Sequence, residues 1–255
     1  MHLVIDVGNT NTVFGIYDSD KLTATWRMAT SRNCTSDEIG LFFLNMMNLE
    51  NIRREEIEGT IISSVVPPVM YSLEHSIRKY LGHRPIIVSA DMDFGIKIAY
   101  PNPREIGADR LVNAYAAYKL YGGPLIIVDF GTATTFCAIS EKGEYLGGAI
   151  CPGVKISLEA LYHNTAKLPR IEIAKPEKII GSSTVGAMQS GTFFSYVGGV
   201  DYMVNGFKKE LGGKATTVAT GGLARMISES TDTIDIINSR LTLDGLNMLY
   251  KNCAK

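Results

Sequence analysis

The sequence predicts an α/β protein built from two copies of one unit, each with the strand and helix order βββαβαβ. The segment Asp-Val-Gly-Asn-Thr at residues 6–10 returns in altered form as Asp-Phe-Gly-Thr-Ala at residues 129–133. Each copy follows an apolar run and precedes a run in which apolar and polar residues alternate. Helical patterns then alternate with short β-branched runs, which is typical of a mixed sheet covered by helices.

The two repeated segments predict a pair of strand-turn-strand tips. Aligning Asp6 with Asp129 also places similar residues in register: Gly8 with Gly131, Asn9 with Thr132, Thr12 with Thr135, and Ile16 with Ile139. Glycine lets backbone amides approach an anion, and a carboxylate at the end of a buried strand is costly unless a charged group lies nearby. Two tips facing each other across a cleft could hold a metal polyphosphate, with Asp6 and Asp129 on cations directly or through water. An ordinary hairpin turn would explain either copy alone, but the repetition favours ligand binding.

The first half continues as the repeat requires. After the first hairpin (strands over 3–5 and 12–17), the pattern predicts a strand over 21–28, a helix behind the capping box Thr35-x-x-Glu38, a strand over 60–66, a helix from Pro67-Pro68, and a strand over 85–88. Prolines then indicate an extended loop over 91–103. A helix opens at 107–110 and stops at Gly122-Gly123-Pro124. We therefore expect one domain over residues 1–121 and a second over 122–255.

The second half repeats the three strands and then departs from the first. The predicted elements are strands over 125–129, 134–140 and 144–150, a helical insert over 154–164, a long helix over 184–211, strands over 215–219 and 234–236, and a closing helix over 241–249. The long helix is rich in Gly, Ala and Ser. Small residues let another group approach closely, so this helix is either a ligand wall or a contact between two copies of the chain.

The bulk composition excludes several classes of function. The 255 residues, 45% hydrophobic and 20% charged, suit two globular domains. A net charge of -1 offers no basic excess, so we expect no nucleic-acid partner. The four cysteines are widely spaced, no leader is recognisable, and no apolar run reaches about 18 residues, so we expect a cytoplasmic protein without a membrane partner. P-loop, dinucleotide-binding and nucleophile-elbow motifs do not occur.

Asp109 and Arg110 are the candidates for chemistry. Asp109 begins a helix, where an acid is favourable on dipole grounds alone, but Arg110 opposes the dipole and indicates an anion outside the helix. A carboxylate beside a phosphate site suits a general base, and a guanidinium could hold charge on the acceptor or the transferred phosphoryl group. Thr184 is either a helix N-cap or a ligand hydroxyl, and Tyr100 is either a packed aromatic or part of the acceptor site.

Five stretches resemble one family, the type III pantothenate kinases, within the superfamily of acetate and sugar kinases, heat-shock chaperone ATPases and actin. They are Asp6 to Thr10 with Gly15, Gly107 to Arg110, Asp129 to Ala133, Pro152-Gly153, and Thr184 followed by Ser190-Gly191. The resemblance implies duplicated actin-like (ribonuclease H-like) domains with a cleft between them. It also implies ATP-dependent phosphorylation of the primary hydroxyl of pantothenate to 4'-phosphopantothenate, the first step of coenzyme A biosynthesis.

The resemblance also implies roles for individual residues. ATP would be contacted by Thr132 and by the first tip, which comprises Asp6, Val7, Gly8, Asn9, Thr10, Asn11, Thr12 and Val13. Mg²⁺ would accompany the nucleotide with Asp6 on it, directly or through water, and Asp129 would bind a monovalent cation, K⁺ or NH₄⁺. Asp109 would be the base, and pantothenate would be held by Tyr100, Gly107, Ala108, Asp109, Arg110 and Thr184. Family members are homodimers. Ser183 and Ser195 depart from the family pattern, which has Asn and Gly there.

Two other functions fit the same residues. One is a kinase of another small hydroxylated acid or sugar, which would keep the phosphate tips and change the acceptor. The other is a nucleotide-sensing regulatory protein of the same fold that binds a partner. Acceptor-stimulated release of ADP distinguishes the enzymes from the sensor, and a panel of acceptors distinguishes the enzymes from each other.

Overall fold

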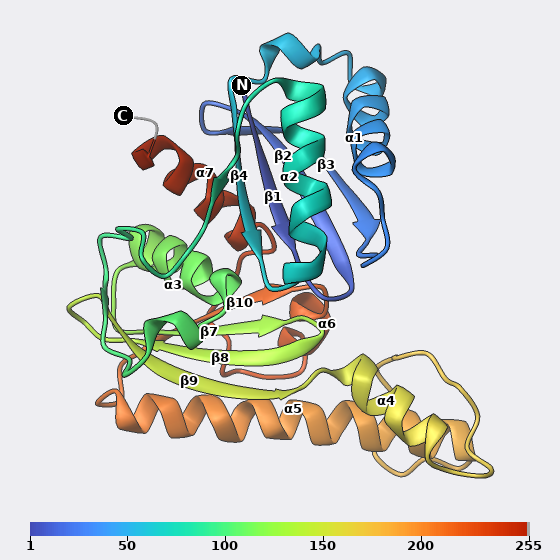
Figure 1. The fold of residues 1–255 in the computed structure, drawn as a ribbon. Coiled ribbons are helices and arrows are strands. Elements are labelled where there is room, and N and C mark those ends of the chain that lie inside the picture. Colours follow the sequence, from blue (N-terminus) through green and yellow to red (C-terminus); the bar gives the residue numbers. More distant parts are fainter. Residues whose placement is uncertain (254–255) are drawn as a thin grey trace. The chain divides into compact units, whose positions relative to one another are not determined.

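The structure, a computed structural model, describes residues 1–253 and divides into two compact units (Figure 1). The first unit comprises residues 1–95, 101–116 and the segment from Arg240 onward, and the second comprises residues 96–100 and 117–239. This division differs from the expected boundary between residues 121 and 122 in one main respect. The closing helix belongs to the N-terminal unit, although we expected it in the C-terminal domain.

The first unit is built on a five-stranded sheet in the order β3-β2-β1-β4-β5. Its strands are β1 (His2–Val7), β2 (Asn11–Asp18), β3 (Lys21–Ala29), β4 (Gly59–Ser64) and β5 (Ile86–Ile87). Strand β2 is antiparallel to both β1 and β3, and β4 and β5 run parallel to β1. The carboxyl ends of β1 and β4 therefore lie at the same sheet edge.

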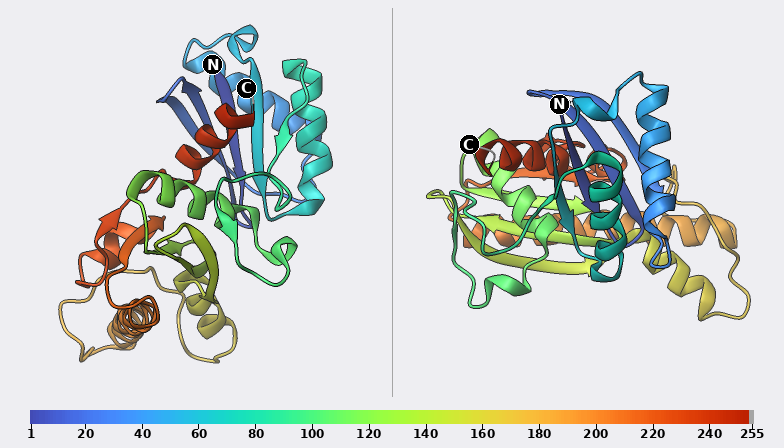
Figure 2. Two further views of the ribbon diagram at one scale, coloured as in Figure 1. Left: turned by 90° about the vertical axis from the view of Figure 1, so that its left-hand side faces the viewer. Right: turned by 45° about the horizontal axis from the view of Figure 1, so that its top comes forward.

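Helices cover both faces of this sheet. Helices α1 (Ser36–Leu49) and α2 (Pro67–Leu81) pack on one face, where Leu3 and Ile5 meet Phe43 and Leu73 in the core. The predicted capping box is present, since Thr35 Oγ1 accepts from the Glu38 N–H and the Glu38 carboxylate accepts from the Thr35 N–H. Helix α7 (Leu241–Cys253) covers the other face, against β1 and β4 (Figure 2).

The second unit repeats this sheet order with one strand added, in the order β11-β10-β7-β8-β9-β6. Its strands are β6 (Lys97–Ile98), β7 (Leu125–Phe130), β8 (Ala133–Ile139), β9 (Glu144–Pro152), β10 (Thr216–Gly221) and β11 (Ile236–Ile237). Strand β6 lies in the segment that we expected to be loop, and it pairs in parallel with the start of β9.

The long helix α5 (Thr184–Glu210) lies along one face of the second sheet (Figure 1). Its Phe193, Val197, Val200 and Val204 pack with residues of β7, β8 and β10. The helical insert is α4 (Val154–His163), and a short helix that we did not predict, α6 (Ala224–Ser228), follows β10. Helix α3 (Ala108–Tyr121) contributes residues to both units, and single turns of 3₁₀ helix, η1 (Arg54–Glu56) and η2 (Pro103–Glu105), precede β4 and α3. Within the described residues no helix is both long and apolar enough to span a membrane.

The two hairpins of the repeat differ in length, which corrects two of the predicted residue pairs. In the first, Val7 pairs with Thr12 across residues 8–11, whereas in the second Phe130 pairs with Thr134 across only residues 131–133. The second tip is therefore one residue shorter. Its counterpart to Thr12 is Thr134 and not Thr135, and both Thr12 and Thr134 are buried. By the same shift Ile16 corresponds to Ala138 and not to Ile139.

Candidate active site

The first tip is closed by hydrogen bonds from β3 as well as its own. The Gly8 N–H donates to Asn11 O at 3.0 Å, and Thr30, just after β3, donates from Oγ1 to Gly8 O at 2.7 Å and from its N–H to Thr10 O at 3.0 Å. Because the Thr30 hydroxyl hydrogen is used in this way, the hydroxyl of Thr12 donates to Thr30 Oγ1 at 2.9 Å. Asn9 and Thr10 remain exposed at the tip, so their polar groups can reach a ligand in solvent.

Asp109 lies at the sheet edge that carries this tip. The Val65 N–H donates to Val7 O at 3.1 Å, which extends the β1–β4 pairing beyond the strand ends. Gly107 packs there, because a Cβ on it would lie 3.3 Å from Val65 Cγ1 and 2.6 Å from Asp109 Oδ1. The first unit therefore brings the 107–110 turn and the first tip to the carboxyl ends of β1 and β4, the position at which α/β sheets bind ligands.

The environment of Asp109 favours its protonated form. Burial raises the pKa of this carboxyl group, and the backbone N–H of Arg110, which donates to Oδ1 at 2.7 Å, opposes the rise together with the Arg110 guanidinium. A buried carboxylate with a raised pKa is a stronger base than an exposed one. This is the property that a general base requires.

In the second unit, two glycines let the backbone close around the second tip. A Cβ on Gly153, which precedes α4, would lie 2.4 Å from Thr132 O, and the Gly153 N–H donates to that oxygen at 3.1 Å. Gly221, at the end of β10, has a φ of +90°, and a Cβ there would lie 2.6 Å from Asp129 Oδ1. The second unit thus places Asp129 and Thr132 together at the carboxyl ends of β7 and β10.

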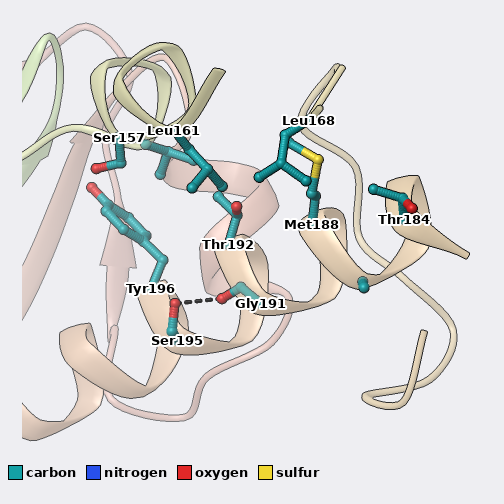
Figure 3. A pocket seen from close by; sticks show the side chains of 11 residues that line it. Ser157, Leu161, Leu168, Thr184, Met188, Gly191, Thr192, Ser195 and Tyr196 are labelled. Atoms are coloured by element: carbon teal, nitrogen blue, oxygen red, sulfur yellow. Dashed lines mark hydrogen bonds between the residues drawn. The ribbon is translucent and has the colours of Figure 1, made fainter. Parts of the chain in front are cut away.

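A cavity of about 660 Å³ lies between α4 and α5 in the same unit (Figure 3). The hydroxyls of Ser157 and Tyr196 are at one end and Thr184 is at the other, with Leu161 and Met188 between them. Tyr196 also hydrogen-bonds Thr134 of the second tip, and burial raises its pKa. Tyr196 therefore connects the cavity with the second tip.

The structure excludes one of the two roles considered for Thr184, that of helix N-cap. Ser183 is the N-cap of α5, since its Oγ accepts from the Gly186 N–H at 3.1 Å. Thr184 is the first helical residue, and its exposed side chain lines the cavity. Ser195, the other departure from the family pattern, donates its hydroxyl to Gly191 O of its own helix.

Tyr100 and Thr184 lie at opposite ends of the second unit. Tyr100 packs edge-on against Tyr145 and lies beside Gly147 of β9. Gly147 lines a second cavity of about 360 Å³ together with Phe207 and Leu211, at the C-terminal end of α5. Thr184 begins that helix, and at 1.5 Å per residue the helix separates the two ends by about 35 Å. Within one chain the structure does not bring these two predicted acceptor residues together.

The chemistry of the site limits how a metal ion could bind. Among residues 1–253 no three His, Cys, Asp or Glu side chains gather as a metal site. Asp6 and Asp129 each lie half-buried beside a polar tip. A hard cation at either carboxylate would take its remaining ligands from other oxygens, such as water, backbone carbonyls or the phosphate oxygens of a nucleotide.

Sequence reasoning missed three residues that shape these tips. Thr30 closes the first tip, Tyr196 holds Thr134 of the second, and Gly221 makes room for the Asp129 carboxylate. The Thr-Gly-Gly sequence at residues 220–222, directly after an apolar strand, was the one available signal, because glycine at a strand end often marks a close approach. No local pattern distinguishes Thr30 or Tyr196 from other hydroxyl-bearing residues.

Comparison of the fold with solved structures agrees with the actin-like prediction. A Campylobacter jejuni protein described as a Baf family transcriptional activator superposes with a TM-score of 0.63 at 19% identity, over 99% of this chain and 98% of that one. The inorganic polyphosphate/ATP-glucomannokinase of Arthrobacter sp. strain KM gives a TM-score of 0.51 at 12% identity, over 99% of this chain and 98% of that one. At these identities the likeness concerns the fold alone, and it confirms the duplicated actin-like architecture.

Sequence comparison identifies the family. The family profile described as type III pantothenate kinase matches residues 2–206. A protein of that name from Exiguobacterium sp. is 54% identical over 255 residues, which cover 100% of both chains. Another, from Halalkalibacterium halodurans, is 51% identical over 251 residues, which cover 98% of this chain and 99% of that one. This chain therefore belongs to the type III pantothenate kinase family.

Proposed function

We propose that Asp109 is the general base of the ATP-dependent phosphorylation of pantothenate, the reaction that membership of this family assigns to the chain. One observation carries this role. Asp109 lies half-buried at the sheet edge that also holds the first tip, and burial raises its pKa. The product is 4'-phosphopantothenate, and the reaction is the first step of coenzyme A biosynthesis. We place it in the cytoplasm, where ATP is available and where the four free cysteines stay reduced.

The nucleotide is held by the backbone amides and side chains of residues 6–13 and by Thr132. Asp6 holds Mg²⁺, directly or through water, and Asp129 holds K⁺ or NH₄⁺. When bound, these cations neutralise phosphate charge. The residues present suit these cations, because each tip offers one half-buried carboxylate and phosphate oxygens and water can fill the other ligand positions.

The chemical step follows from the placement of Asp109. The primary hydroxyl of pantothenate attacks the γ-phosphorus, a new P–O bond forms, and the bond to the β,γ-bridging oxygen breaks to release ADP. Asp109 accepts the hydroxyl proton as the new bond forms. Arg110, Gly107 and Ala108 orient the acceptor, and Arg110 carries a positive charge next to the base. Positioning and charge neutralisation supply most of the rate.

We propose further that the acceptor site is completed by a second copy of the chain. Tyr100 and Thr184 cannot both contact one small molecule within a single chain, because α5 separates them. A stripe of exposed residues, Gly191, Ser195, Gly198 and Tyr202, runs along α5 at helical spacing. Antiparallel packing of two α5 helices along this stripe, about a two-fold axis, would carry Thr184 of the partner subunit towards Tyr100.

Release of ADP tests the reaction. The rate should depend on pantothenate and should be higher in K⁺ than in Na⁺, whereas equal ADP release with and without pantothenate would contradict the assignment.

Mixing two variants tests whether the acceptor site is shared between subunits. Tyr100→Ala and Thr184→Ala should each reduce turnover strongly, and the mixed variants should regain part of it, because each mixed dimer has one intact site. If the two variants exchange subunits and the mixture recovers no turnover, the acceptor site is not shared.

A further inference from the structure

Ser63 has a buried hydroxyl beside Asp6 for which the fold supplies no partner. Its side chain is fully buried, and its Oγ makes no hydrogen bond within the described residues. In the parallel pairing of β1 with β4, Ser63 lies directly opposite Asp6. Side chains opposite each other in adjacent strands point to the same face of the sheet, about 4.8 Å apart along the hydrogen-bonding direction. Buried hydroxyls nearly always have a partner, so Ser63 requires an explanation.

The same juxtaposition occurs in the second unit. Strand β10 holds the place in the second sheet that β4 holds in the first, next to the strand that bears the aspartate. Thr220 lies opposite Asp129 in that pairing, and it is 3% exposed. A buried hydroxyl thus stands beside the tip carboxylate in both copies of the repeat.

Other hydroxyls on these two strands have structural explanations or lie elsewhere. Thr60 Oγ1 bonds the ring of His83 at 2.8 Å, and Ser64 Oγ accepts from the Val66 N–H at 3.1 Å. Thr217 resembles Ser63 in being fully buried with a partnerless hydroxyl, but it lies opposite Ile126, near the start of β10 and away from the tip. Thr217 therefore provides a matched control.

We propose that Ser63 is a positioning residue for the phosphoryl transfer, whose hydroxyl donates to the Asp6 carboxylate when that carboxylate holds Mg²⁺ or its water. The strand register places Ser63 opposite Asp6. Rotation about χ1 can therefore bring the Ser63 hydroxyl to the Asp6 carboxylate without any movement of the strand. Thr220 acts in the same way on Asp129 and its monovalent cation. Groups that orient a metal-bound carboxylate typically change metal affinity or activity by about 10–100-fold when they are removed. This inference rests on the proposed cation roles of Asp6 and Asp129.

Calorimetric binding of ADP, with and without Mg²⁺, tests Ser63 apart from turnover. Ser63→Ala should weaken binding of MgADP about tenfold and leave binding of metal-free ADP unchanged. The melting temperature without nucleotide should not fall below that of Thr217→Val, because the Ser63 hydroxyl bonds no group among residues 1–253. Ser63→Thr, which restores a hydroxyl, should recover MgADP binding. Ser63→Cys replaces the alanine variant if the latter does not fold.

Thr220→Val supplies a second, crossed comparison. It should raise the K⁺ concentration for half-maximal rate about tenfold and leave MgADP affinity unchanged, while Thr217→Val alters neither quantity. Normal MgADP affinity in Ser63→Ala, together with weakened affinity in Asp6→Asn, would overturn the inference and leave the role of Asp6 intact. Normal affinity in Asp6→Asn would remove the cation role itself and the inference with it.

Discussion

A carboxyl group that the fold largely shields from water costs folding free energy whenever it is ionised. Asp109 is such a group, because burial raises its pKa. The folded state binds its proton more tightly than the unfolded state does. The cost is therefore absent below the ordinary pKa of about 3.9 and grows as the pH rises towards the folded pKa. An enzyme that keeps this residue gives up stability at neutral pH for a stronger base.

Asp109→Asn should therefore separate activity from stability. We expect turnover to fall by about a hundredfold or more, with ADP binding retained, because the amide cannot accept the hydroxyl proton. We also expect the melting temperature at pH 7.5 to stay level or rise. Steady-state kinetics and calorimetry measure both, with the exposed Asp18→Asn as control. Near-normal turnover would remove Asp109 from the role of base.

Gly221 offers a test of the space around Asp129. Its φ of +90° strains any other residue, and an added Cβ would also collide with the Asp129 carboxylate and the Phe130 backbone. Gly212 has a similar φ of +81° and no atom within reach of an added Cβ. Gly221→Ala should therefore lose activity and K⁺ dependence, whereas Gly212→Ala should show only the cost of backbone strain, about 1 kcal/mol. If Gly221→Ala and Gly212→Ala have equal effects on chemical denaturation and on turnover, the collision with Asp129 has no special role.

At the scale of elements, the sequence predicted those that carry their own signal. The long β-branched strands, the capping box at Thr35 and the proline start of α2 lie within a few residues of their predicted positions. Strand β6 and helix α6 are too short to show a periodic pattern, and contacts with the rest of the unit determine them. The one-residue difference between the hairpins also escaped, because hydroxyl residues at both 134 and 135 made two registers equally plausible.

The interface between β1 and α7 contains a histidine that should make stability depend on pH. His2 donates from Nε2 to Asn247 Oδ1 at 2.5 Å and stacks on Tyr250 at 4.3 Å between ring centroids. Burial lowers the pKa of His2, and so the folded state favours the neutral ring. The stabilisation is fully present above the ordinary pKa of about 6.5 and is lost as the pH falls below it.

His2→Phe keeps a ring in the stack and removes the titration. We expect the unfolding free energy to fall by about 1–3 kcal/mol at pH 7.5, because Asn247 loses a buried partner. Its dependence on pH between about 6.5 and 5 should become flatter than in the parent chain. Urea titrations across this range measure both effects. The exposed His163→Gln is the control, and an unchanged slope in His2→Phe would assign the acid sensitivity to other groups.

At the scale of the whole molecule, the sequence predicted two repeated units but not how the chain is divided between them. The chain passes from one unit to the other after Gly95, Tyr100, Ala116 and Ser239. An amphipathic pattern over residues 241–249 shows that one helix face is buried, but not which sheet buries it. The same limit applies to the candidate site. The repeat predicted the tips and the turn at residues 107–110 predicted Asp109, whereas the separation of Tyr100 from Thr184 depends on the direction of α5.

Removal of residues 240–255 should unfold the first unit and spare the second. Helix α7 buries Leu241, Leu243, Leu246 and Leu249, and each such side chain contributes about 1.5–3 kcal/mol. Their sum approaches the whole stability of a typical domain, about 5–15 kcal/mol. Hydrogen exchange should show loss of protection in β1, β2 and β4 and retention in β7, β8 and β10. Lys251→Ala, which breaks an exposed ion pair with Asp20, should change neither, and retained protection in β1 after truncation would contradict the expectation.

Helix α7 also sets an order of events during translation. A ribosome has made every residue of the second unit, up to Ser239, before it begins α7. The nascent N-terminal sheet therefore emerges with α1 and α2 on one face and nothing from its own unit on the other. We expect the apolar side chains of that face to stay exposed, and so prone to aggregation, until α7 has been made.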